Sequence, residues 1–181
     1  MSNSFIIKGN ICQTKNPKGL DLHEKAYVVC ENGLSKGVFV AHYPASNMNL
    51  TSGIAPIRKY LDLELNIGLG SDIAGGHSES IFRAITDTIQ VSKMYFRMVD
   101  ENYKPLVFSE AFYLATKGGG KFFGKVGSFE NGYEFDAIVL NDKVLSHPQQ
   151  LNLAERMERA VYLGLDEKGL IAKYVAGKKV L

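Results

Sequence analysis

The feature that most constrains this chain is a glycine-interrupted apolar stretch at residues 66–77. Ile67 and Leu69 alternate with glycines, and this pattern predicts a short buried strand to which another backbone comes close. The Ala-Gly-Gly sequence at residues 74–76 predicts a loop with positive φ. Asp72 then lies at the carboxyl end of a strand, where β/α barrels hold their catalytic residues. Asp is also common as a simple turn cap, and the stretch alone favours that interpretation.

The segments around this stretch predict a parallel β/α arrangement. Residues 38–41 are an apolar run, and Pro56 suits the first position of a helix. A second helical pattern follows Ser78 as its N-cap and continues to about Met98. The order strand, loop, helix, strand, loop, helix is typical of parallel β/α units and not of a meander. We therefore expect an α/β unit over residues 39–124.

Strands are predicted at both ends of the chain. Residues 26–30 are branched and aromatic, and Asn32-Gly33 is a hairpin signal before the next apolar run. Near the other end, residues 136–140 form a strand pattern and residues 173–180 form a hairpin around Ala176-Gly177. The fold class that follows is α/β plus β.

Three further segments complete the prediction. Residues 42–53 are polar and rich in turn residues, so we expect a loop there. Ser109 caps a helix over residues 110–116, which the glycines at 118–120 stop. Residues 153–163 form a helix with a charged outer side.

Composition limits the classes of function. A net charge of +2 over 181 residues is too small to indicate a nucleic-acid or membrane surface. There is no apolar run long enough to cross a bilayer, and the first residues do not resemble a secretory leader. Two cysteines, Cys12 and Cys30, are expected to be reduced and buried. We therefore expect a cytoplasmic protein of one domain or two small ones.

The chain has no local metal-binding motif. Its histidines are scattered and form no HxH or HExxH pair, and its cysteines form no CxxC pair. The four histidines are His23, His42, His77 and His147.

A series of short motifs over residues 40–181 resembles the carboxyl half of guanine deaminases, in the metal-dependent amidohydrolase superfamily. Residues 5–39 also resemble the amino-terminal strands of that family, most clearly at residues 26–33. The motifs occur in the family's order: His42-Tyr-Pro-Ala-Ser-Asn47, Ser52-Gly53 with Pro56-Ile-Arg-Lys59, Gly68-Leu-Gly-Ser-Asp72, Glu110-Ala-Phe-Tyr-Leu-Ala-Thr116, Gly124-Lys-Val-Gly-Ser-Phe-Glu130, Phe135-Asp-Ala-Ile-Val139, Glu155-Arg-Met-Glu-Arg159, Tyr162-Leu-Gly164 and Tyr174-Val-Ala-Gly-Lys178.

The resemblance implies a barrel of eight β/α units beside a β-sandwich built from both ends of the chain. Residues 1–38 and 125–181 would form that composite β-sandwich, and residues 39–124 would be the last two β/α units of the barrel. A complete barrel takes roughly 200 residues or more. We therefore expect an internally deleted form that passes from the first strands directly to the seventh barrel strand.

The resemblance also implies a zinc site and a reaction. In the family, an HxH pair, two later histidines and an Asp bind zinc, and Asp72 matches that Asp as metal ligand and proton shuttle. The metal acidifies a water that attacks C2 of guanine, which gives xanthine and ammonia. No histidine here matches a ligand motif, including His42 and His77. One carboxylate does not hold a zinc that needs about three protein ligands, so we expect this chain alone not to retain it.

Three interpretations stay open at this stage. The chain is a guanine deaminase-type enzyme with guanine as substrate, or an inactive remnant that associates with itself or with a full-length homologue. Composition alone also allows an unrelated α/β binding module. Open edges of parallel strands leave backbone groups unpaired, so we expect an aggregation-prone surface and a homo-oligomer.

Overall fold

The computed structural model describes residues 5–13, 21–31 and 34–181, and the helices and strands that follow refer to these residues. The elements, in chain order, are β1 (Phe5–Gln13), β2 (Asp21–Glu31), β3 (Leu34–His42), α1 (Pro44–Asn49), α2 (Ile57–Asp62), β4 (Asn66–Leu69), α3 (Ile81–Met98), α4 (Phe108–Tyr113), the π-helical turn η1 (Leu114–Gly118), β5 (Ala137–Leu140), the 3₁₀ turn η2 (Asp142–Val144), α5 (Leu153–Tyr162), α6 (Leu165–Lys168), β6 (Leu170–Val175) and β7 (Lys178–Lys179).

Strand β3 joins two kinds of structure. Its first half pairs antiparallel with β2, with Val38 opposite Val28, and its second half pairs parallel with β4, with Val40 opposite Ile67. The resulting four-stranded sheet has the order β1-β2-β3-β4. Helices α1 and α2 connect the two parallel strands, which confirms the predicted parallel β/α connection. Asn32 and Gly33, where the hairpin turn was predicted, lie outside the described residues.

The glycine pattern of β4 has the predicted cause at Gly68. A Cβ atom there would lie 2.8 Å from the Cα of Gly119 and 3.1 Å from the Phe39 ring, so another backbone does come close. The loop at residues 74–76 does take positive φ, but at Ala74 (93°) and not at its two glycines, and Asp72 before it also has positive φ (46°). The loop therefore bends at residues that have side chains.

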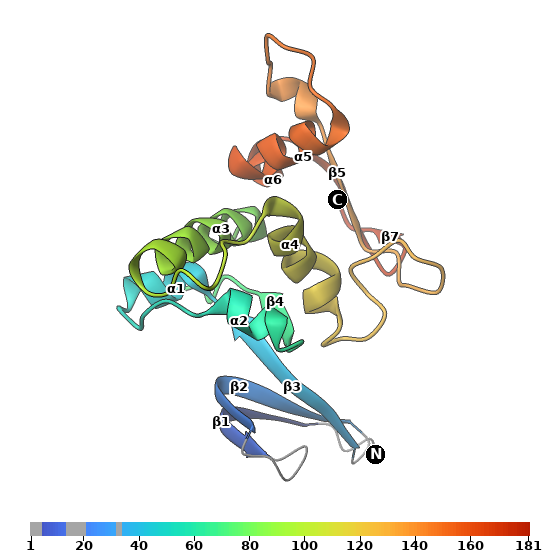
Figure 1. Cartoon of the computed structure of the whole chain (residues 1–181). Helices are drawn as coiled ribbons and strands as arrows, with labels where there is room; N and C mark the ends of the chain where they lie inside the picture. Colours follow the sequence, from blue (N-terminus) through green and yellow to red (C-terminus); the bar gives the residue numbers. More distant parts are fainter. Residues whose placement is uncertain (1–4, 14–20, 32–33) are drawn as a thin grey trace.

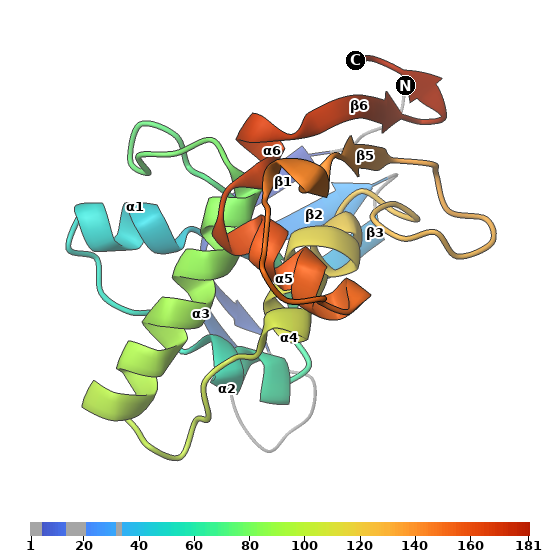
Figure 2. The same ribbon diagram turned by 90° about the horizontal axis from the view of Figure 1, so that it is seen from above.

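Two apolar clusters hold the helices to the sheet and to each other. The first packs β3 and β4 against α2 and η1, and its buried members are Val40, Ile57, Ile67, Leu106 and Leu114. The second joins α3 to α4 and α5, and its buried members are Phe82, Ile85, Ile89, Ala111 and Val161. Seen from above, α5 lies across α3 and α4 (Figure 2). No described helix is long and apolar enough to cross a membrane.

The strands at the two ends of the chain lie in different sheets. β1, β2 and β3 belong to the four-stranded sheet, whereas β5, β6 and β7 form a separate antiparallel sheet. Figure 1 shows the first sheet at the bottom of the molecule and the second at the upper right. The strands of the two ends therefore do not share a sheet, because β3 runs straight from the hairpin into its parallel pairing with β4. The division into residues 1–38 with 125–181 and residues 39–124 stays a prediction.

Several predicted elements are confirmed with shifted boundaries. The strand at 136–140, the helix at 153–163 and the terminal hairpin correspond to β5, α5 and β6–β7. α3 begins after Ser80, whose Oγ accepts a hydrogen bond from the Arg83 amide at 3.1 Å, and not after Ser78. Similarly, α4 begins at Phe108, one residue before the expected cap Ser109. The predicted loop after β3 instead contains α1, which begins at Pro44.

An ion pair fixes α2 to the start of α4. Arg58 donates from Nη1 to Oε1 of Glu110 at 2.8 Å and from Nη2 to Oε2 at 2.6 Å. The Val107 amide donates to the same carboxylate at 2.9 Å. The hydrogen bond from Arg58 lowers the pKa of Glu110, and the hydrogen bond from the Val107 amide lowers it further, despite the opposing effect of burial. Such a paired carboxylate stabilises the fold only while it is ionised.

We expect Glu110→Gln to destabilise the protein by about 1–2 kcal/mol at pH 7, because the pair is bidentate but partly solvent-exposed. The difference from wild type should disappear as the pH falls from the ordinary pKa of 4.5 through the lowered pKa of Glu110. Urea denaturation at a series of pH values measures it. Glu101→Gln, which breaks the exposed pair with Arg97, is the matched control and should have little effect at any pH. A stability difference between Glu110→Gln and wild type that does not change with pH would mean that the ionised Glu110 carboxylate is not its cause.

Candidate functional site

Asp72 lies three residues beyond β4, at the carboxyl end of a parallel strand as predicted. Its backbone has φ of 46°, a left-handed conformation that Asp tolerates better than most residues but that still costs free energy. Its side chain is solvent-exposed, and its Oδ2 accepts a hydrogen bond from the Ser46 hydroxyl at 2.7 Å. The carboxylate is therefore held in place while it stays accessible.

Helix α1 holds the loop that carries Asp72. Besides Ser46, Asn49 donates from Nδ2 to the carbonyl oxygen of Gly75 at 3.0 Å. A Cβ atom at Gly75 would lie 2.6 Å from the Ser46 hydroxyl, so glycine is what allows this close contact. Sequence reasoning missed the role of Ser46, because residues 42–53 were expected to form a loop. A proline followed by small polar residues also fits the first turn of a helix, and this was the available signal.

A cavity of about 320 Å³ brings His42 and Asp72 together at this end of β3. His42 is only 3% exposed, and burial lowers its pKa to about 4. Neither of its ring nitrogens has a hydrogen-bond partner in the described part of the chain. The backbone carbonyl of His42 accepts a hydrogen bond from the Gly70 amide at 3.0 Å, which fixes the ends of β3 and β4 together.

Neither His77 nor His147 lines this cavity. His77 is exposed. Burial raises the pKa of the Asp87 carboxyl in α3, against the opposing effects of His77 and of Arg83, its ion-pair partner at 2.9 Å. His147 lies in the exposed loop before α5, where its Nδ1 accepts a hydrogen bond from the Gln149 amide. The side chain of His23 lies outside the described part of the structure.

The described side chains do not fit a zinc ion. Within residues 5–13, 21–31 and 34–181, no three His, Cys, Asp or Glu side chains form a group that could hold a metal. The Asp72 carboxylate already accepts a hydrogen bond from the Ser46 hydroxyl, and of the described His, Cys, Asp and Glu residues only His42 lines the cavity with it. A catalytic zinc normally has three protein ligands and an open position. The arrangement around Asp72 can accept protons and hydrogen bonds but does not by itself form a metal centre.

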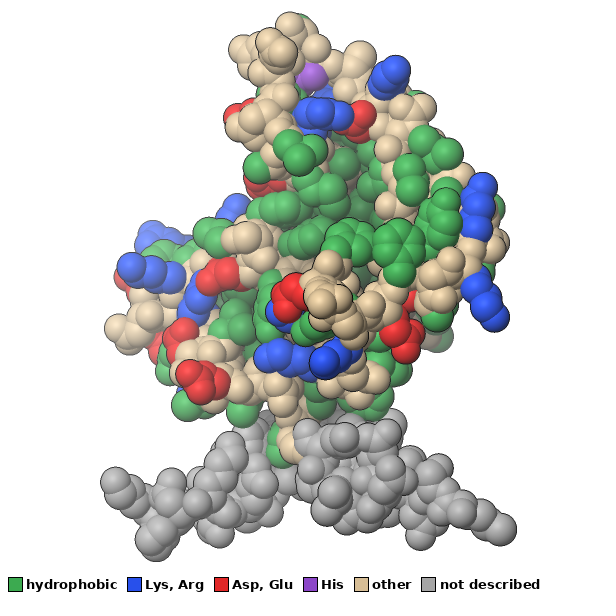
Figure 3. Space-filling model, turned by 90° about the vertical axis from the view of Figure 1, so that its right-hand side faces the viewer, with side chains coloured by type: hydrophobic (Ala, Val, Ile, Leu, Met, Phe, Trp, Pro, Cys, Tyr) green, Lys and Arg blue, Asp and Glu red, His purple; other side chains and the backbone are tan. Residues whose placement is uncertain are grey.

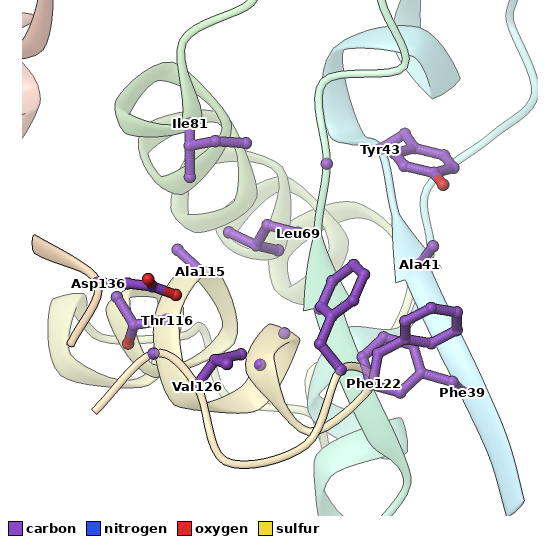
Figure 4. A pocket seen from close by; sticks show the side chains of 16 residues that line it. Phe39, Ala41, Tyr43, Leu69, Ile81, Ala115, Thr116, Phe122, Val126 and Asp136 are labelled. Atoms are coloured by element: carbon purple, nitrogen blue, oxygen red, sulfur yellow. The ribbon is translucent and has the colours of Figure 1, made fainter. Parts of the chain in front are cut away.

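A larger apolar cavity lies on the other face of β3. It measures about 560 Å³ and is lined by Phe39 of β3, Tyr43 just after β3, Leu69 of β4, and residues in and after η1. Figure 4 shows Phe39 and Phe122 close together on one side and Asp136 with Thr116 on the other. The Phe39 and Phe122 rings meet edge to face with centroids 5.3 Å apart. Sequence reasoning did not identify this cavity, although the glycines and phenylalanines at 118–129 were its signal.

With this geometry in place, comparison with known proteins identifies the class. The profile of the amidohydrolase family matches residues 19–178, so the chain belongs to the amidohydrolase family. Within it, the chain is 38% identical over 148 residues to a guanine deaminase of Dictyostelium discoideum and 38% identical over 157 residues to that of Homo sapiens. These matches cover 78% and 81% of the chain but only 32% and 34% of the relatives.

Solved structures agree with the sequence relatives. Guanine deaminase from C. acetobutylicum with bound guanine has a TM-score of 0.74 and 50% identity, covering 79% of this chain and 34% of that one. E. coli guanine deaminase has a TM-score of 0.67 and 27% identity, covering 81% and 34%. The chain therefore spans about a third of the length of the curated relatives it matches. This confirms the resemblance and the truncated character expected from the motifs.

Proposed function

We propose that this chain is part of a guanine deaminase-type amidohydrolase, which hydrolyses guanine to xanthine and ammonia. The observation that carries the proposal is 38% identity to guanine deaminases over about four-fifths of the chain. The similarity to a guanine deaminase structure with bound guanine supports the same conclusion. Because the chain spans about a third of those proteins, we propose that activity requires residues beyond the described ones.

Asp72 is the residue that we propose as the catalytic carboxylate and metal ligand of the complete site. Its place after a parallel strand, its left-handed backbone and the hydrogen bond from Ser46 support this role. Strands β3 and β4 would then be the last two strands of a barrel, and β4 would pair with strands that lie outside this chain.

Zinc and guanine would both depend on those additional residues. The described side chains supply one carboxylate of the family's ligand set, so we propose that this chain alone holds zinc weakly or not at all. A cytoplasmic location and a homo-oligomeric state stay predictions.

The test is complementation. We expect purified chain to release no ammonia from guanine, with or without added zinc. Mixed with a C. acetobutylicum guanine deaminase that lacks the corresponding third, it should restore xanthine formation. Asp72→Asn should lower the restored rate by about 10²–10⁴-fold, the range for loss of a proton-transfer group.

The control variant is His77→Gln, an exposed residue of the same loop that should leave the restored rate unchanged. Two results would contradict the proposal. One is turnover by the chain alone that Asp72→Asn leaves intact. The other is no turnover in a mixture that forms a stable complex by size-exclusion chromatography.

A further inference from the structure

A small polar cavity lies between η2 and the first turns of α5. It measures about 220 Å³, and its lining comes from η2, the loop after it and α5. In Figure 1 this segment, drawn in orange, is the uppermost part of the molecule, whereas β4 lies in its middle. The cavity shares no lining residue with the one that contains His42 and Asp72. It is therefore separate from the candidate catalytic carboxylate.

Basic side chains dominate the lining of this cavity. Lys143, Arg156 and Arg159 contribute to it together with His147, against the carboxylate of Asp142. That carboxylate neutralises Arg156, whose Nε donates to it at 2.6 Å. Within the described part of the chain, no acidic side chain forms an ion pair with Lys143 or Arg159. The cavity therefore has an excess of positive charge that an anion would compensate.

The chain itself holds the hydrogen-bond donors of the cavity in place. The Arg159 guanidinium donates from Nη1 to the carbonyl oxygen of Leu145 at 2.7 Å and from Nη2 to that of Ser146 at 3.1 Å. These bonds fix the guanidinium, and each of the two nitrogens keeps a second hydrogen. The Nδ1 of His147 accepts a hydrogen bond from the Gln149 amide, so the ring proton lies on Nε2 and is available to a ligand. An anion in the cavity therefore meets positioned donors and not only mobile charges.

Size and charge together limit the ligand to a small anion. Cavities that enclose a drug-sized molecule measure about 300–1,000 Å³, so a volume of about 220 Å³ admits a single compact group. A phosphate group carries a charge of about −1.5 to −2 at pH 7 and has three acceptor oxygens. The donors come from three segments, with Lys143 on η2, His147 in the loop and Arg159 on α5. Such an arrangement suits a tetrahedral phosphate better than a planar carboxylate with two oxygens.

We propose that this cavity binds a phosphate dianion, either inorganic phosphate or the phosphate group of a monoester, between Lys143, His147 and Arg159. The site uses neither zinc nor Asp72, so it does not rest on the proposed deaminase function. Because the basic side chains are partly solvent-exposed, the dissociation constant is expected to be on the order of 1 mM.

Titration with sodium phosphate at a fixed pH of 7 tests the proposal. We expect inorganic phosphate to shift the imidazole resonances of His147 saturably in heteronuclear NMR of histidine-labelled protein. The resonances of His42 and His77 should not move, because neither residue lines the cavity. Sodium acetate at equal ionic strength is the planar control and should bind at least about tenfold more weakly. In about 1 M NaCl, where the Debye length is about 3 Å, the phosphate shift should be largely lost.

Two charge variants should move the affinity in opposite directions. Lys143→Gln removes a cation from the lining, so phosphate should bind at least about fivefold more weakly. Asp142→Asn removes the carboxylate and releases Arg156 to the ligand, so phosphate should bind several-fold more tightly. Lys173→Gln is the matched control, because it removes the same charge from an exposed lysine outside the cavity and should leave the affinity unchanged. Lys143 is exposed as well, so the two lysine variants still decide the question if Asp142→Asn does not fold.

Phenyl phosphate separates the two sources of the anion. Binding as tight as that of inorganic phosphate would assign the site to a monoester whose ring lies outside the cavity, and binding of inorganic phosphate alone would assign it to the free anion. Three results would overturn the proposal. They are the absence of a saturable shift at His147, equal binding of acetate and phosphate, and an equal loss of affinity in Lys143→Gln and Lys173→Gln.

Discussion

Gly68→Val is expected to destabilise the protein by about 3 kcal/mol or more and to broaden its unfolding transition. A Cβ atom at Gly68 would lie 2.8 Å from the Gly119 backbone, so β4 and the end of η1 must separate to admit a larger side chain. Overpacking a core typically costs 1–3 kcal/mol, and contact with backbone leaves less freedom to relax. Urea denaturation followed by circular dichroism measures the loss.

Two other glycines provide controls for this effect. Gly53 has φ of 97° and no atom within 4 Å of an added Cβ, so Gly53→Ala tests backbone strain alone and should cost about 1 kcal/mol. At Gly70 the close atoms belong to the Tyr43 ring, a side chain that can move, so Gly70→Ala should cost less than Gly68→Ala. A Gly68→Val protein as stable as Gly53→Ala would mean that β4 and η1 are not in contact.

Local patterns in the sequence were sufficient for the elements closest to the site. The alternation around Ile67 predicts β4, and Pro56 predicts the start of α2, whose first residue, Ile57, is buried. Both signals lie within a single element or directly before it. A parallel connection between β3 and β4 followed from element order alone, and the pairing of the strands confirms it.

Predictions were incomplete where a residue's role depends on a distant partner. The glycines at 118–120 were expected to stop a helix, and the helical structure does end at Gly120, after the π-helical turn η1. Their function is contact: a Cβ at Gly118 would lie 3.0 Å from the carbonyl oxygen of Ile67. No pattern within residues 118–120 predicts that β4 packs against them, because β4 lies about fifty residues earlier in the chain.

The site shows the same limit. Asp72 could be placed at a strand end from sequence, but its hydrogen bond to Ser46 joins residues 26 positions apart. His42 was set aside because it matched no ligand motif, and only the folded structure shows that its ring is buried with no hydrogen-bond partner among the described residues. Burial of a polar side chain is a property of the tertiary structure, so it was not predictable from residues near His42.

The last prediction concerns the apolar surface between α3 and the C-terminal sheet. The cavity of about 560 Å³ beside β3 adjoins another of about 760 Å³, and both are lined by Ile81 and Asp136. Phe123 and Phe129 stand beside them, 77% and 76% exposed. On this side of the molecule, hydrophobic side chains gather across the middle of the face (Figure 3). Large exposed apolar patches are sites of association.

We expect the wild-type chain to associate as its concentration rises, because a net charge of +2 provides little repulsion between copies. The double variant Phe123→Ser, Phe129→Ser should raise the dissociation constant at least about tenfold, as loss of central aromatic contacts does at interfaces. Sedimentation velocity over a wide concentration range measures both proteins.

The matched control is the pair Met98→Ser and Leu63→Ser, which removes hydrophobic side chains of 71% and 59% exposure that line neither cavity. If nonspecific hydrophobic contacts drive association, the control should reduce association as strongly as the double Phe variant does. If the surface between α3 and the C-terminal sheet drives it, the control should behave like wild type. A wild-type chain that stays monomeric at every concentration would exclude both causes of association. It would mean that Phe123 and Phe129 remain exposed to solvent in the monomer.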